Sequence, residues 1–342
     1  MLLKIAVVGA TGAVGKEALA LLEKRALPID TLRCFASARS AGKGLLFRGE
    51  EIGVEMLDAR SFEGSDVVLF CAGSQVSKEW VSIALKPGAR VVDCSSYFRM
   101  DPNVPLIIPE INGHVLNVEH RLIASPNCST TIMLMALAPL HRAARIKRVV
   151  VATYQAASGA GAQAMKELQE ETLCFLGGES YERSVMPFPY AFNLFTHNSH
   201  FHENGYAEEE LKMLYETQKI LDDPTIQVHA TCVRVPVLRA HSEALNVTFE
   251  REMRVEEAYA ILKEAPGVAL LENRTQNRFP MPLDAMEQEA IYCGRIRKDP
   301  SHPNTLDLWV VGDQLLKGAA LNAIQIIEQL SLLISRGCKL TG

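Results

Sequence analysis

The chain has 342 residues, of which 48% are hydrophobic and 22% are charged, and its formal net charge is -5. This composition is ordinary for a globular protein, and the length is sufficient for two domains that each bury a core. The acidic balance argues against nucleic acid or an anionic membrane as the main partner. No apolar run approaches the ~18 residues that a membrane span requires.

The N-terminal residues 1–5 lead directly into an apolar run, without the charged region and cleavage site of a secretory signal. The eight cysteines form no C-x-x-C pair and no Cys/His cluster with the spacing of zinc ligands. We therefore expect reduced thiols, no disulfide framework, no bound metal and a cytoplasmic location.

The first predicted elements are a strand at residues 4–8, a glycine loop at 9–15 and a helix at 16–24. In this order, a G-x-x-G-x-x-G loop lets the backbone approach a pyrophosphate at the helix N-terminus. A plain tight turn is the alternative, but the position at the start of a βαβ series favours a dinucleotide site. Its expected cofactor-binding residues are Gly9, Thr11, Gly12, Ala13, Val14 and Gly15.

The second predicted strand, residues 31–36, ends without the Asp or Glu that binds the ribose of NAD. Ser37, Arg39 and Ser40 follow instead, and a polar, basic segment at this position suits the 2′-phosphate of NADP. A solvent-exposed basic loop is the alternative reading of these residues. We expect NADP to be the cofactor.

Alternating strands and helices continue through the first part of the chain. Strands at 66–71 and 90–94 flank a helix at 77–86. This alternation predicts an α/β domain with a doubly wound parallel sheet of the Rossmann type. We place the domain at residues 1–127 and expect a C-terminal helix at 313–335 to complete it.

Beyond residue 130 the predicted strands are longer and the crossovers fewer, which favours an α+β domain with a mixed sheet. We place this catalytic and dimerisation domain at residues 128–312, with a long loop at 177–204. The expected strands are 147–155, 226–236, 244–250, 290–297 and 304–311, and the expected helices are 161–175, 206–221 and 255–265.

Cys128 lies between an apolar strand-like run at 121–124 and strong helix formers at 132–138. Pro126 disfavours a helix before it, and Asn127 is a good N-cap, so Cys128 falls in the first turn of the helix. The unpaired N–H groups and the dipole at that end favour a thiolate and can hold an oxyanion. A buried structural cysteine is the alternative, but this context favours a nucleophile.

With these elements in place, the chain resembles the aspartate-semialdehyde dehydrogenase family along nearly its whole length. Several short motifs in the same order are far more specific than any one of them. The resemblance implies a nucleotide-binding domain and a catalytic domain, assembled as a homodimer or a dimer of dimers. The matching segments are 9–15, 37–43, 95–101 (SSYFRMD), 126–130 (PNCST), 154–161 (YQAASGAG), 210–212, 231–242 (TCVRVPVLRAHS), 292–297 and 317–325 (KGAALNAIQ).

The resemblance implies an NADPH-dependent enzyme that interconverts L-aspartyl 4-phosphate and L-aspartate 4-semialdehyde, on the way to lysine, threonine and methionine. By residue, it implies that Cys128 is the nucleophile, that His241 is the acid/base catalyst and that Gln155 orients the substrate. Arg234 would bind the α-carboxylate and Glu210 the ammonium group, because a forked guanidinium and a carboxylate suit these charges.

Further roles follow from the same resemblance. Arg99 and Lys212 would hold the phosphate, which as a dianion requires more than one cation, and Asn127 belongs to the substrate-binding set. Packed or solvated side chains are the alternative for residues such as His241 and Lys212. Additional cofactor contacts are implied for Gly73, Ser158, Gly159 and Asn322, the last with the nicotinamide amide.

Two other functions fit part of the pattern. An N-acetyl-γ-glutamyl-phosphate reductase shares the cysteine and the nucleotide domain, but its acetylated substrate has no ammonium group for Glu210 to bind. A catalytically silent NADP-binding regulatory protein would not need the catalytic and carboxylate-binding residues together. Two segments depart from the family pattern, since the loop at 71–75 lacks a second glycine and residues 192–197 match loosely.

Overall fold

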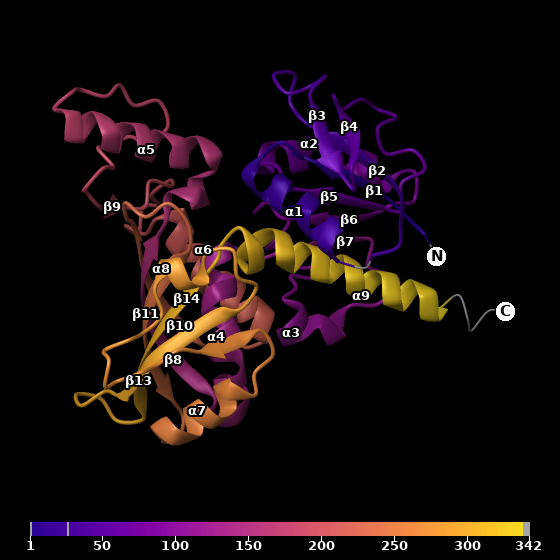
Figure 1. Ribbon diagram of the computed structural model, residues 1–342. Coiled ribbons are helices and arrows are strands. Elements are labelled where there is room, and N and C mark those ends of the chain that lie inside the picture. The colour runs from indigo at the N-terminus through magenta and orange to yellow at the C-terminus, as the bar shows by residue number, and fades with distance from the viewer. Residues whose placement is uncertain (1, 26, 338–342) are drawn as a thin grey trace. The chain divides into compact units, whose positions relative to one another are not determined.

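The computed structural model describes residues 2–25 and 27–337. The chain divides into two units, one formed by Met1–Asn127 with Ala319–Gly342 and the other by Cys128–Gly318. In Figure 1 the first unit is indigo and purple with the final yellow helix, and the second runs from magenta to orange. Each unit has its own seven-stranded sheet.

The sheet of the first unit has the strand order β3-β4-β2-β1-β5-β6-β7. All neighbouring strands pair in parallel except β3 and β4, which form an antiparallel hairpin. The predicted doubly wound parallel sheet is confirmed. Its strands are β1 (Leu3–Val8), β2 (Ile29–Phe35), β3 (Gly44–Phe47), β4 (Glu50–Glu55), β5 (Val67–Phe70), β6 (Arg90–Asp93) and β7 (Leu122–Ala124).

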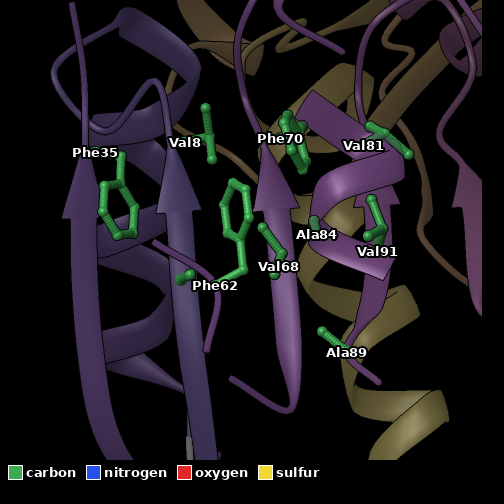
Figure 2. Packing of buried hydrophobic residues seen from close by; sticks show 10 residues of the cluster. Val8, Phe35, Phe62, Val68, Phe70, Val81, Ala84, Ala89 and Val91 are labelled. Carbon is green, nitrogen blue, oxygen red and sulfur yellow. The ribbon is translucent and has the colours of Figure 1, made fainter. Parts of the chain in front are cut away.

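Apolar side chains fill the space between the parallel strands and helix α2 (Ser74–Leu85), as Figure 2 shows. Phe62, from the segment before β5, lies between Phe35 and Phe70, with its ring centroid 6.0 Å from each. All three rings are buried, and burial of each contributes roughly 1.5–3 kcal/mol. This packing fixes the carboxyl ends of β1, β2 and β5, where the predicted nucleotide-binding loops begin.

The remaining helices of the first unit are α1 (Ala13–Lys24), the short α3 (Pro109–Asn112) and α9 (Leu321–Gly337). Helix α9 contacts α1, α3 and β6. Among the described residues, one helical stretch, Leu316–Ser335, is long and apolar enough by composition to cross a membrane, and 50% of it is buried within the structure. A buried core helix meets the same criteria as a membrane span.

Helix α9 begins later than the predicted helix at 313–335. Strand β14 (Thr305–Gly312) ends immediately before Asp313, whose Oδ1 accepts the backbone N–H of Leu315 at 2.9 Å. A π-helical turn, Leu316–Ala320, then precedes the regular helix. The side-chain acceptor of Asp313 competes with the helix for these N–H groups, and apolar composition alone could not predict this interruption.

The sheet of the second unit has the order β12-β13-β14-β11-β8-β10-β9. It mixes parallel pairs, such as β8 with β10, and antiparallel pairs, such as β8 with β11. The predicted α+β unit with a mixed sheet is confirmed. Its other strands are β8 (Ile146–Gln155), β9 (Phe195–Thr196), β10 (Gln227–Arg234), β11 (His241–Phe249), β12 (Val268–Leu270) and β13 (Ile291–Lys298).

Helix α4 (Cys128–Ala144) lies on one face of this sheet and contacts β8, β11, β13 and β14. Helices α6 (Glu208–Leu221) and α7 (Val255–Lys263) pack beside α4. Most of α4 is buried around its whole circumference, so it forms the centre of this core. The other helical segments are the 3₁₀ turn Ala157–Ala160, α5 (Ala162–Gly177) and α8 (Pro282–Ala285).

The opposite face of the same sheet is open. Residues alternate between the two faces along a strand, and on β8 Thr153 is buried while Tyr154 is exposed. A groove of about 340 Å³ on the open face is lined by residues that include Tyr154, Asn246 and Trp309. The rings of Tyr154 and Trp309 contact each other, with their centroids 5.5 Å apart.

Several short elements lie outside the predicted strands and helices, among them β12, α3 and α8 as well as the β3–β4 hairpin and β9. The β3–β4 hairpin turns at Arg48 and Gly49, which both have positive φ angles of 50° and 81°, but the polar residues of this segment obscure its strand pattern. The predicted loop at 177–204 contains the short strand β9, which pairs with β10. A two-residue strand carries no periodicity from which it could be recognised.

Two buried glutamates on α5 hold the long segment that follows this helix. Glu167 accepts the backbone N–H groups of Ser184 at 2.6 Å, Val185 at 2.8 Å and Met186 at 2.6 Å. Glu171 accepts those of Tyr190 at 2.8 Å and Ala191 at 3.0 Å. The segment therefore has a defined path, although it contains almost no regular secondary structure.

We expect Glu167→Gln to lower the free energy of unfolding by roughly 1–3 kcal/mol, because one amide oxygen cannot replace a carboxylate that accepts three N–H groups. Burial raises the pKa of Glu167, but the backbone hydrogen bonds outweigh burial and hold the pKa below its ordinary value. A lowered carboxyl pKa stabilises the fold above the unfolded-state pKa, and this contribution disappears as the pH falls through the folded-state pKa. Denaturant unfolding at neutral pH and in acid measures both effects.

Glu182→Gln is the matched control, since Glu182 is exposed on the same segment. It should leave stability unchanged within about 0.5 kcal/mol. Equal effects of the two substitutions would show that the three N–H contacts contribute nothing specific.

Candidate active site

Three buried polar side chains lie at one end of adjacent strands in the second unit. Arg234, the last residue of β10, pairs in register with Gln155, the last residue of β8. His241 begins β11 beside them, because the next residue, Ser242, pairs with Tyr154. Arg234 is 5% exposed, Gln155 1% and His241 0%. The long-range pairing of three strands thus brings a cation, an amide and an imidazole together.

Cys128 is the first residue of α4, as the sequence predicts. Gln155 Nε2 donates to the hydroxyl of the neighbouring Ser129 at 2.8 Å, which ties this helix end to the row of polar residues. The backbone of Gly318 lies directly against the thiol residue, since a Cβ at Gly318 would be 2.9 Å from Cys128 Cβ. Only glycine leaves this space, so the position of Cys128 depends on close backbone packing.

The ring of His241 is held in one tautomer by the backbone. Ala156 N–H donates to His241 Nδ1 at 3.0 Å, so Nδ1 is the acceptor and the proton of the neutral ring is on Nε2. Burial, followed by the nearby Arg234 cation, lowers the pKa of His241 to about 3. Nε2 has no hydrogen-bond partner among the residues that the structure describes. A neutral Nε2–H donor is therefore available to a substrate.

Gly159 lies beside both His241 and Arg234. A Cβ at this position would be 2.9 Å from His241 Nε2 and 2.9 Å from Arg234 Nη1. The absence of a side chain keeps the donor groups of both residues accessible. Nearby, Ser158 Oγ accepts from Gln314 Nε2, and Gln314 Oε1 accepts the N–H of Ala240 at 2.9 Å, which supports the residue preceding His241.

Helix α6 adds a buried carboxylate and a lysine. Gln155 Nε2 donates to Glu209 Oε1 at 3.1 Å, and Lys212 Nζ lies 3.5 Å from Glu209 Oε2. Lys212 is also 3.1 Å from the carboxylate of Glu208. Glu209 is 6% exposed. An anion and a cation thus lie next to the amide of Gln155.

Glu210 occupies a different environment. Its Oε2 accepts the N–H of Ala207 at 2.9 Å, at the start of α6, and its Oε1 accepts the N–H of Cys232 at 3.0 Å. Both oxygens therefore bind the backbone, and this side chain caps the helix and joins it to β10. The contact of Glu210 with a substrate ammonium group stays a prediction.

The first unit contains the predicted glycine loop at the carboxyl end of β1. Gly9 has a φ angle of +83°, and a Cβ there would be 2.6 Å from the carbonyl oxygen of Cys71. A Cβ at Gly15 would be 2.2 Å from the carbonyl oxygen of Gly9. No side chain caps the N-terminus of α1 at Gly12. The loop is thus a close-packed backbone cradle whose helix N–H groups suit a pyrophosphate.

The other predicted cofactor residues of this unit lie at the ends of β2 and β5. Arg39 is exposed and makes no hydrogen bond or ion pair with the described residues, and Ser37 next to it in the turn is also exposed. The N–H of Ser40 donates to Ser37 O at 2.8 Å, which closes the turn. Gly73 is the N-cap residue of α2, again without a side-chain cap.

Arg99 and Asn322 bind their own unit. Arg99 Nε donates to Ser125 O at 2.9 Å and Nη2 to Cys94 O at 2.8 Å. Asn322 Nδ2 donates to Ile107 O and to Ser125 Oγ, both at 2.9 Å. Both side chains therefore organise the segment that leads to Asn127, which is itself buried. Contacts of Arg99 with phosphate and of Asn322 with nicotinamide stay predictions.

The described cysteines and potential metal ligands form no further cluster. No disulfide bond joins the cysteines that the structure describes, and Cys338 lies outside the described residues. Within residues 2–25 and 27–337, no group of three or more His, Cys, Asp or Glu side chains is arranged to hold a metal ion.

Two family models match the chain: semialdehyde dehydrogenase, NAD binding domain, over residues 4–118, and semialdehyde dehydrogenase, dimerisation domain, over residues 137–317. An aspartate-semialdehyde dehydrogenase of Synechocystis sp. is 51% identical over 98% of both chains. One of Bacillus subtilis is 46% identical over 97% of this chain and 98% of its own. The chain belongs to the aspartate-semialdehyde dehydrogenase family.

A solved structure agrees with this assignment. The crystal structure of aspartate semialdehyde dehydrogenase II from Vibrio cholerae, complexed with ASA, has a TM-score of 0.91 and 39% identity, covering 97% of this chain and 98% of that one. The family resemblance inferred from short motifs is confirmed, together with the two-part fold.

The sequence analysis missed two residues of the cluster in the second unit. One is Glu209, which is in helical phase with the buried Met213 and Ile220, and this phase is a usable sequence signal. His197, which contacts Arg234, lies in a segment without periodicity and had no such signal. In this family member, long-range packing brings Gln155 to Ser129, the residue after Cys128, and Gly318 to Cys128 itself.

Proposed function

We propose that this protein is an NADP-dependent aspartate-semialdehyde dehydrogenase, which reduces L-aspartyl 4-phosphate to L-aspartate 4-semialdehyde with release of phosphate. The observation that supports it most is the row of Arg234, Gln155 and His241 with Glu209 bound to Gln155. It places a guanidinium suited to a carboxylate and a carboxylate suited to an ammonium group in the neighbourhood of one amide. A 2-amino acid derivative carries both of these charges.

Cys128 is the nucleophile in this proposal. Its thiolate attacks the acyl carbon, the C–O bond to phosphate breaks, and phosphate leaves with the electron pair and gains a proton from water. A thioester on Cys128 results. NADPH, when bound, supplies the hydride that reduces this thioester. The C–S bond then breaks, so that the aldehyde leaves and the thiolate is restored.

His241 stabilises the oxygen of the reacting carbonyl. Each tetrahedral intermediate on Cys128 carries a negatively charged oxygen. The carbonyl group re-forms from this oxyanion without protonation of the oxygen. A neutral ring with its proton on Nε2 offers a hydrogen bond to that oxyanion, whereas loss of this proton would leave an anionic ring. We therefore assign His241 as an oxyanion hydrogen-bond donor, a narrower role than the acid/base catalyst expected from sequence.

The other polar residues position the substrate. Arg234 binds the α-carboxylate, Gln155 the reacting end of the substrate, and Glu209, rather than Glu210, the ammonium group. Lys212 and Arg99 contribute positive charge for the phosphate, which leaves as an anion. Asn127 belongs to the same set, as the residue preceding the nucleophile.

The first unit fits NADP. Gly9 and Gly15 let the loop pack closely, because a Cβ at either position would collide with neighbouring backbone, and Thr11, Gly12, Ala13 and Val14 supply backbone at that helix end. Ser37, Arg39 and Ser40 would hold the 2′-phosphate, and Gly73, Ser158, Gly159 and Asn322 complete the proposed set.

The protein forms a homodimer in this proposal. The dimerisation-domain model covers residues 137–317, and the open sheet face with Tyr154 and Trp309 has partly exposed aromatic surface suited to a second copy. A dimer of dimers would have twice the mass, and light scattering distinguishes the two. Reduced cysteines suit a cytoplasmic location.

One assay tests the proposed function directly. The protein is incubated with L-aspartate 4-semialdehyde, phosphate and NADP⁺, beside parallel reactions with N-acetyl-L-glutamate 5-semialdehyde and reactions without phosphate. NADPH should form with the first aldehyde only, and only when phosphate is present. Formation of NADPH with the acetylated aldehyde alone would assign the chain to the other reductase, and no reaction with either would contradict an enzymatic role.

Arg39→Ala should narrow the preference for NADPH over NADH by roughly 1–3 kcal/mol in kcat/KM, because the guanidinium would lose charge-assisted hydrogen bonds to the 2′-phosphate. The activity with NADH should stay nearly the same. Arg60→Ala is the matched control, since Arg60 is also exposed in the first unit but lies outside the loop. A wild-type enzyme that uses both cofactors equally would contradict the assignment of Arg39.

A further inference from the structure

His197 is fixed in place by the strand before it. Its backbone N–H donates to Cys232 O at 2.8 Å, directly after β9 pairs with β10. In that pairing Phe195 lies opposite Arg234. The His197 side chain is 7% exposed. A buried imidazole is thus anchored two residues beyond the partner of Arg234, in the segment that Glu167 and Glu171 hold.

The ring of His197 provides the shortest contact of the Arg234 guanidinium. His197 Nε2 lies 2.8 Å from Arg234 Nη2, and the Ser199 N–H lies 3.2 Å from Nδ1 on the other side of the ring. A neutral ring accepts at one nitrogen only, and since arginine can only donate, we assign the acceptor to Nε2, at the shorter contact, and the proton to Nδ1. The other contact, from Nη1 to Ala156 O, is 3.5 Å long. Arg234 Nε has no partner, and no carboxylate forms an ion pair with Arg234 among the described residues. The orientation of this guanidinium therefore depends mainly on His197.

The charges around His197 keep its ring neutral. Burial, followed by Arg234, lowers the pKa of His197 to about 4. From α6, the carboxylates of Glu209 and Glu208 oppose this effect and Lys212 adds to it. At neutral pH the ring is thus an uncharged hydrogen-bond acceptor. It does not neutralise the positive charge of Arg234, which stays available to a substrate carboxylate.

We infer that His197 is a positioning residue, which orients the Arg234 guanidinium by accepting a hydrogen bond from Nη2 and leaves its other donors for the α-carboxylate of the substrate. This inference rests on the proposed function, because that function supplies the carboxylate. A neutral acceptor is suited to this task, since a carboxylate in the same place would compete with the substrate for the charge of Arg234.

Two substitutions that differ by one methylene group test the inference. In His197→Gln, the amide oxygen is as many bonds from Cβ as Nε2 is, so it can accept from Arg234. In His197→Asn the same group is one bond too short. KM for aspartate semialdehyde should rise about 10-fold or more in the Asn variant, while the Gln variant stays within about 3-fold of wild type. KM for NADP⁺ should not change in either variant, and the melting temperatures of both variants should equal that of the wild type.

A double-mutant cycle with Arg234→Lys separates positioning from a general structural effect. Lysine has no second nitrogen for His197 to orient, so adding His197→Asn should change kcat/KM less than 2-fold in that background. Equal KM values of the His197→Gln and His197→Asn variants would overturn the inference. So would a His197→Asn effect that is as large in the Arg234→Lys background as in the wild type. A wild-type protein that does not convert aspartate semialdehyde would contradict the proposed function instead.

Discussion

Cys128→Ser should reduce kcat by at least ~10³-fold without changing the fold, because a serine hydroxyl at this position has no general base to activate it. The wild-type thiolate is favoured by its place at the start of α4. Steady-state kinetics in the phosphorylating direction measures the loss. The melting temperature should stay close to that of the wild type, since sulfur and oxygen differ little in size.

Labelling with iodoacetamide checks the same assignment without a mutation. Cys128 should react faster than the other cysteines, because burial raises the pKa of Cys34 to about 11 and that of Cys293 to about 12 and keeps these thiols protonated. Cys174→Ser, in α5, is the matched control and should leave kcat unchanged. If peptide mapping finds another cysteine labelled first while Cys128 stays inert, the nucleophile has been misassigned.

The fold was predictable where local patterns decide it. The apolar run of β1, the glycine loop and the start of α1 follow from steric and hydrogen-bonding rules that act over a few residues. The position of Cys128 at a helix start follows in the same way from Pro126 and Asn127. By contrast, strand β9 depends on its pairing with the distant strand β10. The interruption at Asp313 results from a local side-chain hydrogen bond, which the apolar pattern of the segment does not indicate.

The composition of the candidate site was predictable to a greater extent than its geometry. Resemblance identified Arg234, Gln155 and His241, but their arrangement in one row results from the register of three strands. Glu209 and Glu210 have the same chemistry, and only their directions from α6 separate them. One binds Gln155 and the other caps the helix. The apolar stripe of the helix, which places Glu209 in phase with Met213 and Ile220, is the sequence signal that distinguishes the two glutamates.

The tautomer of His241 likewise depends on tertiary structure. The donor that fixes it, Ala156 N–H, belongs to a segment far away in the chain, and no sequence pattern links the two. A histidine found by motif is naturally read as an acid/base catalyst with a pKa near neutrality. Complete burial beside Arg234 changes that expectation, because it makes the protonated ring unfavourable.

His241→Asn should lower kcat by ~10²–10³-fold, the loss that is typical of removing one oxyanion hydrogen-bond donor. Since asparagine leaves Arg234 and Glu209 in place, KM for aspartate semialdehyde should change much less than kcat. Arg234→Lys should do the opposite and raise KM, because it keeps the charge but loses the forked geometry. Thermal melts close to wild type are needed to read either result as catalytic.

The pH dependence of kcat separates an oxyanion donor from a proton-transfer catalyst. With a folded-state pKa of about 3, His241 stays neutral throughout the range in which the enzyme is assayed. The wild-type profile should therefore have no limb near pH ~6.5, the ordinary value for histidine, and the Asn profile should be parallel to it at a lower level. A change in kcat near neutral pH that is present in the wild type and absent in His241→Asn would instead identify His241 as an acid/base catalyst. It would also mean that Ala156 N–H does not donate to Nδ1 during turnover.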